Sequence, residues 1–155
     1  MPPEFPPALL DQLVGIAKRI RSRDPSDQPE LVADFNLHAG TEFDRKHFDG
    51  MGAPSEHRSW IEKSLLRVAA QKQNFISEDE ILELIARLLE AKRYSDREAY
   101  FWMETLDGFL PDPNLRDLIH GPGKYFGDCD NSRQITPREI LDAACAADND
   151  SDLIP

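Results

Sequence analysis

Three segments in the second half of this 155-residue chain carry the same helix-start signal, a Ser or Thr followed three residues later by Glu. They are Ser77-Glu78-Asp79-Glu80, Ser95-Asp96-Arg97-Glu98 and Thr136-Pro137-Arg138-Glu139. In such a capping box the hydroxyl accepts a hydrogen bond from a free amide of the first turn, and the Glu side chain accepts one from the amide of the capping residue. Because each box stands just before an apolar periodic pattern, the sequence predicts three helix starts.

The residues after the first and third boxes repeat at helical spacing. One apolar stripe predicts a helix over about 78–92, and it consists of Ile81, Leu84, Ile85, Leu88 and Leu89. A second stripe predicts a last helix over about 137–147, with Ile140, Leu141, Ala144 and Cys145 together. We therefore expect Cys145 to be a small core residue.

The helix after the second box, over about 96–110, has a less regular pattern. Tyr100, Phe101 and Trp102 are consecutive, so they cannot all face one core. A buried line of Ala99, Trp102, Leu106 and Phe109 leaves the other face to Asp96, Tyr100, Met103, Glu104 and Asp107. Such a mixture of acids with Tyr and Met suits a protein interface. Alternatively, Tyr100 and Met103 pack under the N-terminal segment.

The first half of the chain also has helical patterns, over about 8–22, 29–37 and 56–72, with a polar loop at 38–57. No segment shows a convincing alternation of β-branched residues, so we predict an all-α protein. We expect an N-terminal helical extension at 1–76, a helical bundle at 77–147 and an acidic tail at 148–155.

The predicted segments differ in net charge. The chain has a formal net charge of −11, and residues 77–147 hold 15 acids and 8 bases, whereas residues 1–76 hold 11 acids and 10 bases. An acidic surface argues against nucleic acid as a direct ligand and suits a basic protein partner. The alternative is that the acids only keep the protein soluble. We expect a cytoplasmic protein, since there is no signal peptide or membrane-spanning run.

Motifs for catalysis are not found. The chain has no G-x-S-x-G elbow, P-loop or G-x-G-x-x-G fingerprint, and its two cysteines form no disulfide framework. Candidate metal ligands gather in the 38–57 loop, namely His38, Asp44, His47, Asp49 and His57. Their spacing fits no compact metal motif. We therefore expect no enzyme and no cofactor, and keep a metal-dependent enzyme as a third hypothesis.

A Gly/Pro-rich segment, DLIHGPGKYFGD at 117–128, lies between two predicted helices and is too short for an ordinary helix. The predicted capped helix at 78–92 is followed by the acidic capped helix at 96–110 and a linker at 111–116. Next come the motif Asp117-Leu118-Ile119-x-x-Pro122, an acidic loop, and a helix that begins at Thr136-Pro137. Over about residues 75–147 this order resembles the immunity proteins of the DNase colicins and pyocins. The resemblance implies a distorted four-helix bundle whose short third helix carries D-L-I-Y-Y-P.

The resemblance also implies a binding surface. In that family the short third helix, held by buried Leu and Ile, presents side chains to a toxin, and the acidic second helix decides which toxin is bound. Carried over by position, the second-helix surface comprises Glu98, Ala99, Tyr100, Met103 and Asp107. The third-helix surface comprises Asp117, His120 and Gly121.

The chain departs from the family pattern at its main anchor, since His120-Gly121 replaces the tyrosine pair. Aromatic anchors usually dominate the energy of an interface. Tyr125 and Phe126 follow closely and are candidate substitutes, or else core residues under the loop. The N-terminal extension is absent from the small members of the family.

The first hypothesis is therefore an immunity protein that neutralises a cognate toxin, a basic nuclease-like domain, by steric and electrostatic occlusion. Its candidate partner-binding residues are Asp96, Glu98, Tyr100, Met103, Glu104, Asp107, Asp117, His120 and Tyr125. The second hypothesis is a non-catalytic helical adaptor or regulatory protein with an unrelated partner.

Overall fold

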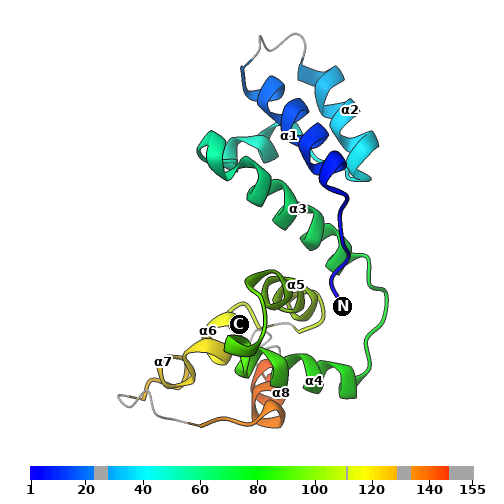
Figure 1. Ribbon diagram of the computed structural model, residues 1–155. Helices are drawn as coiled ribbons and strands as arrows, with labels where there is room; N and C mark the ends of the chain where they lie inside the picture. Colours follow the sequence, from blue (N-terminus) through cyan, green and yellow to red (C-terminus); the bar gives the residue numbers. More distant parts are fainter. Residues whose placement is uncertain (23–27, 111, 129–133, 147–155) are drawn as a thin grey trace, which may run out of the picture. The chain divides into compact units, whose positions relative to one another are not determined.

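The computed structural model describes residues 1–22, 28–110, 112–128 and 134–146, and within these ranges the chain contains helices and no strand (Figure 1). The predicted all-α class is confirmed. No helix among these residues has the length and apolar character needed to cross a membrane. The predicted acidic tail at 148–155 lies outside the described residues, as does Cys129, the other of the two cysteines.

The chain divides into two compact units. The N-terminal unit is Pro3–Ala69, and the C-terminal unit is Ala70–Pro155 together with Met1–Pro2. The division falls inside helix α3 (His57–Gln71), whereas the sequence suggested a boundary after residue 76.

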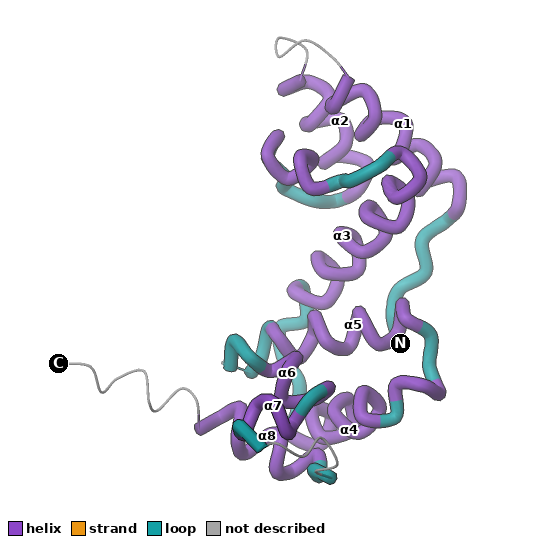
Figure 2. The backbone as a smooth tube through the Cα atoms, turned by 90° about the vertical axis from the view of Figure 1, so that its left-hand side faces the viewer, coloured by secondary structure: helices purple, strands orange, loops and turns teal. Residues whose placement is uncertain are grey.

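In the N-terminal unit, α1 (Pro7–Ser22) and α2 (Gln28–Ala39) lie side by side, as Figures 1 and 2 show, and α3 follows after a connection. These helices confirm the three that the first half of the sequence predicts. The connection contains two 3-10 helices, η1 (Arg45–Gly50) and η2 (Pro54–Glu56), where we expected a loop with one turn. Short 3-10 turns leave little trace in hydrophobic periodicity.

Asn36 determines how the chain turns back after α2. Its amide donates to the Phe43 carbonyl at 2.8 Å, and its Oδ1 accepts from the Phe43 amide at 2.9 Å and from the Thr41 hydroxyl at 2.8 Å. This brings Phe43 and Phe48 to Phe35, whose ring lies 5.0 Å from that of Phe48 in an edge-to-face pair. The aromatic rings and the buried face of α1 form one hydrophobic core.

The C-terminal unit begins each of its longer helices at a predicted box. These are α4 (Glu78–Leu89), α5 (Asp96–Asp107) and α8 (Pro137–Ala146). In each box the amide of the capping residue donates to the Glu carboxylate, at 2.9 Å for Ser77, 3.0 Å for Ser95 and 2.9 Å for Thr136. All three predicted helix starts are confirmed.

Helix α4 lies against α5, α8 and the short helix α6 (Leu115–His120) (Figure 2). The 3-10 helix η3 (Ala91–Arg93) connects α4 to α5. On α8 the buried residues are Ile140, Leu141 and Ala144. The prediction of a buried Cys145 is wrong, because its side of the helix is exposed and the thiol is free.

Helix α5 corrects the predicted exposed face. All six residues from Phe101 to Leu106 are buried, including Met103 with 2% of its surface exposed and Glu104 with 8%. The expectation that Met103 and Glu104 face solvent is therefore wrong. An amphipathic rule assigns one face to solvent, but a helix covered on several sides has no such face. Of the predicted buried line, Trp102 and Leu106 are buried, whereas Ala99 and Phe109 are half-buried.

His47 is packed among aromatic rings in the N-terminal unit. Its ring stacks on Phe43 at 3.7 Å and lies 4.8 Å from that of Trp60, and its Nε2 is 3.3 Å from the Ser64 hydroxyl. Burial, with help from the charge of Arg67, lowers the pKa of His47 below its ordinary value of 6.5, and Asp44 opposes the shift. The folded state therefore favours the neutral imidazole.

This predicts a loss of stability in acid. Because the folded pKa of His47 lies below the unfolded value, its contribution is complete above pH 6.5 and is lost as the pH falls from there towards the folded pKa. His47→Gln removes the titrating ring and keeps a group that can bond Ser64. In urea unfolding followed by tryptophan fluorescence, we expect wild type to lose more stability than His47→Gln between pH 7.5 and 5.5. Equal losses would contradict the role given to His47.

Candidate partner-binding site

Residues 115–126, which include most of the Gly/Pro-rich segment, form two consecutive short helices, α6 and α7 (Pro122–Phe126), and we call them the knuckle. Leu115, Leu118 and Ile119 are buried and attach α6 to the C-terminal unit. No separate helix after Gly121 was expected from the sequence. Pro122 starts one because proline suits the first helical position, and Gly127 ends it in the left-handed conformation at φ 70°.

A buried carboxylate, that of Asp112, anchors the knuckle through two hydrogen bonds. Asp112 is 4% exposed, and its Oδ1 accepts a hydrogen bond from the Asn114 amide at 2.7 Å. Its Oδ2 accepts one from the Tyr125 hydroxyl at 2.5 Å. This hydrogen bond, together with partial burial and the charge of the carboxylate, raises the pKa of Tyr125 to about 12. Tyr125 therefore has a structural role in joining α7 to the residues that precede α6.

Two cations of the same segment lie beside the predicted acidic residues. The Arg116 guanidinium lies 3.7 Å from a Glu104 oxygen and 3.6 Å from an Asp107 oxygen. Lys124 lies 2.8 Å from Asp117. Sequence spacing does not reveal the pair of Lys124 with Asp117, because the two residues are seven positions apart across a turn and match no helical i,i+4 spacing.

The predicted site residues fall into two groups. Asp96 and Glu98 lie in the first turn of α5, where the Glu98 carboxylate accepts from Ser95. Asp107 lies in the last turn, about 16 Å along the helix axis from Asp96. Tyr100, between them, is half-buried. The structure therefore brings Asp107 to Arg116 of the knuckle and leaves Asp96 and Glu98 at the far end of α5.

The knuckle itself exposes a mixed surface. His120 is exposed at the end of α6, and Asp117 is half-buried. Neighbouring groups exclude part of the water around the His120 imidazole, and this partial desolvation, with the nearby Arg116 charge, lowers the pKa of His120, which favours the neutral ring. Phe126 is 39% exposed, and its ring meets that of Tyr125 edge to face at 5.0 Å. Phe126 is thus the accessible aromatic side chain of the pair.

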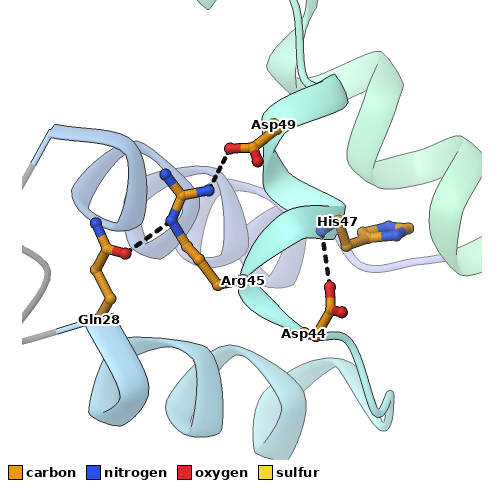
Figure 3. A network of polar contacts seen from close by, with 5 residues as sticks. All are labelled: Gln28, Asp44, Arg45, His47 and Asp49. Carbon is orange, nitrogen blue, oxygen red and sulfur yellow. Dashed lines mark hydrogen bonds and ion pairs between the residues drawn. The ribbon is translucent and has the colours of Figure 1, made fainter.

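Three of the candidate metal ligands of the N-terminal unit, Asp44, His47 and Asp49, point in different directions (Figure 3). Asp49 pairs with Arg45, which also donates to Gln28 Oε1 at 2.8 Å, and Asp44 accepts from the His47 amide at 3.0 Å. His38 pairs with Asp34 at 3.3 Å, and His57 Nε2 lies 3.3 Å from Arg21. Among the residues that the structure describes, no three His, Cys, Asp or Glu side chains are grouped to hold a metal ion.

Comparison of the chain with protein-family models, with curated proteins and with solved structures finds no match.

The structural role of Tyr125 gives a second prediction. Tyr125→Phe removes one donor from a buried carboxylate, so we expect the C-terminal unit to lose about 1–3 kcal/mol of unfolding free energy. Tyr94→Phe is a matched control, because the Tyr94 ring packs on Trp102 while no hydrogen bond of its hydroxyl is among the contacts of the described residues. We expect the control to change stability by less than about 0.5 kcal/mol in chemical denaturation. A Tyr125→Phe variant as stable as the control would show that Asp112 does not need the hydroxyl.

Proposed function

We propose that the chain is an immunity-type protein, which binds a cognate bacterial toxin and neutralises it without catalysis. The toxin we propose is a basic, nuclease-like domain. The bound protein would cover the surface with which the toxin contacts nucleic acid, and its negative charge would repel the phosphates of that substrate.

The knuckle is the observation that supports this proposal best. A short helix fixed by Leu118 and Ile119 follows two capped helices and precedes a third capped helix, in the order that the resemblance to the colicin immunity proteins implies. The exposed side chains of the knuckle are held on a backbone that buried residues anchor. Because this backbone is already ordered, less conformational entropy is lost when a partner binds. We propose the distorted four-helix bundle of that family as the finer description of this unit.

The structure changes which residues we propose for contact. Met103 and Glu104 are buried, and Tyr125 is bonded to Asp112, so these three support the surface. The proposed contact residues are Asp107, Asp117, His120 and Phe126. Phe126 takes the place of the family's tyrosine anchor, because it is the exposed aromatic residue of the knuckle.

The net negative charge of the C-terminal unit supports a basic partner. Residues 77–147 have a formal net charge of −7 from 15 acids and 8 bases. The pair of Lys124 with Asp117 is exposed, with 73% and 48% of the two side chains accessible. Exposed pairs contribute little stability, so a cation of the partner can replace Lys124 at small cost.

The same ion pairs favour a second candidate function. Arg116 and Lys124 already neutralise Asp107 and Asp117, so the knuckle is less acidic than its sequence suggests. A near-neutral surface with one exposed aromatic residue also suits a helical adaptor or regulatory protein whose partner is not a toxin.

The deciding experiment is co-purification of the tagged chain with the product of the adjacent reading frame, followed by a DNA-cleavage assay. Recovery of a basic domain at equal stoichiometry, and its inhibition by the chain, would support the immunity function. Recovery of a different partner, or a bound domain whose cleavage activity is unchanged, would favour the adaptor.

Phe126 gives the prediction for the contact surface. Phe126→Ala removes the proposed anchor, and we expect partner affinity to fall at least about 30-fold, as for a hot-spot residue. Phe75→Ala is the control, because Phe75 is 81% exposed and lies outside the knuckle. Affinity measured by titration calorimetry should be unchanged in the control. Equal effects of the two substitutions would remove the knuckle from the interface.

A further inference from the structure

A cavity of about 220 Å³ lies between α4 and α5, away from the knuckle. One wall is a single face of α4, with Glu80, Glu83, Leu84 and Arg87 at helical spacing. The opposite wall is α5, with Phe101, Trp102 and Thr105. A cavity of about 150 Å³ is enough to hold benzene, so this one has room for the end of a long side chain.

Two carboxylates make this cavity acidic. Glu80 uses Oε2 for the capping box, where it accepts from the Ser77 amide and hydroxyl at 2.9 and 2.7 Å. These hydrogen bonds lower the pKa of Glu80 and keep it ionised, while Oε1 has no hydrogen bond among the described residues. Glu83 is paired with Arg87. The three charged side chains therefore carry a net charge of −1, and the other lining residues are Met1, Gln73 and Ile76.

The cavity already accepts one cation from its own chain. The Arg87 guanidinium lies over the Trp102 ring, 5.4 Å from its centroid, while it also pairs with Glu83. Aromatic faces and carboxylates together are the usual environment of a guanidinium in proteins. The residual charge of Glu80 and the adjacent Phe101 ring offer the same chemistry to a second cation.

We infer that this cavity receives an Arg or Lys side chain of a partner protein. The identity of the partner rests on the proposed function, which requires a basic protein. The ability of the cavity to bind a cationic side chain does not depend on that function. The cavity lies on α4 and α5 and so gives the partner a second contact, separate from the knuckle.

The test uses Nα-acetyl-argininamide as the probe and the indole N–H resonances of the intact protein as the readout. The chain has two tryptophans, and Trp60→Phe assigns their two signals. The Trp102 N–H is buried and has no hydrogen-bond partner in the part of the chain that the structure describes. We expect a saturable shift of the Trp102 signal with the arginine probe and none with the citrulline analogue, which has the same shape without the charge.

Glu80→Gln is the matched variant, because Gln preserves the capping box and removes the charge. We expect it to weaken binding of the probe about fivefold, as for loss of one exposed charge contact. Glu139→Gln makes the same change in the box of α8, outside the cavity, and should leave affinity unchanged. Equal binding of the citrulline analogue, or an unaltered affinity in Glu80→Gln, would overturn the inference.

The two proposals can fail separately. If the probe does not bind but the toxin domain is still inhibited, the cavity is not a cation site and the proposed function stands. If the probe binds with the expected charge dependence and no toxin is recovered, the cavity remains a site for basic side chains and the proposed function fails.

Discussion

The helices of the C-terminal unit depend on carboxylates that satisfy the unpaired amides at their N-termini. Glu80, Glu98 and Glu139 each accept a hydrogen bond from the amide of a Ser or Thr cap. Asp112 has the same role before α6, where its carboxylate accepts a hydrogen bond from the Asn114 amide. An amide left unpaired at a helix start costs free energy, so these four side chains determine where the helices begin. The positions of the cavity and of the knuckle follow from those starting points.

This use of carboxylates changes how the charge of the unit is understood. A net charge of −7 over residues 77–147 suggests an acidic surface open to a basic partner. In the structure Asp107 and Asp117 lie beside the cations Arg116 and Lys124, whereas the hydrogen bonds at the capping carboxylates do not neutralise their charge. The charge that remains for a partner is therefore local. At the α4–α5 cavity it resides on Glu80, and at the knuckle it depends on exposed pairs that a partner can exchange.

The sequence predicted which side chains are buried better in the knuckle than in α5. Leu118 and Ile119 are buried as the resemblance implied. They are the adjacent apolar residues of a short polar segment, and removing apolar side chains from water is favourable. Met103 and Glu104 were placed on the wrong side, because periodicity assumes that each helix has one solvent face. Helix α5 is buried over six consecutive residues, and Glu104 lies near Arg116 from a different helix. No spacing within α5 reveals such a partner.

By itself the sequence determined the helical class and the starts of α4, α5 and α8, because capping and periodicity act over a few residues and are written in consecutive positions. Tertiary structure alone decided that α7 is attached through Tyr125 to Asp112, and that Glu80 and Trp102 line one cavity. These contacts join residues that are distant in the chain. Their existence depends on how the helices pack, and no local preference of a single segment specifies that packing.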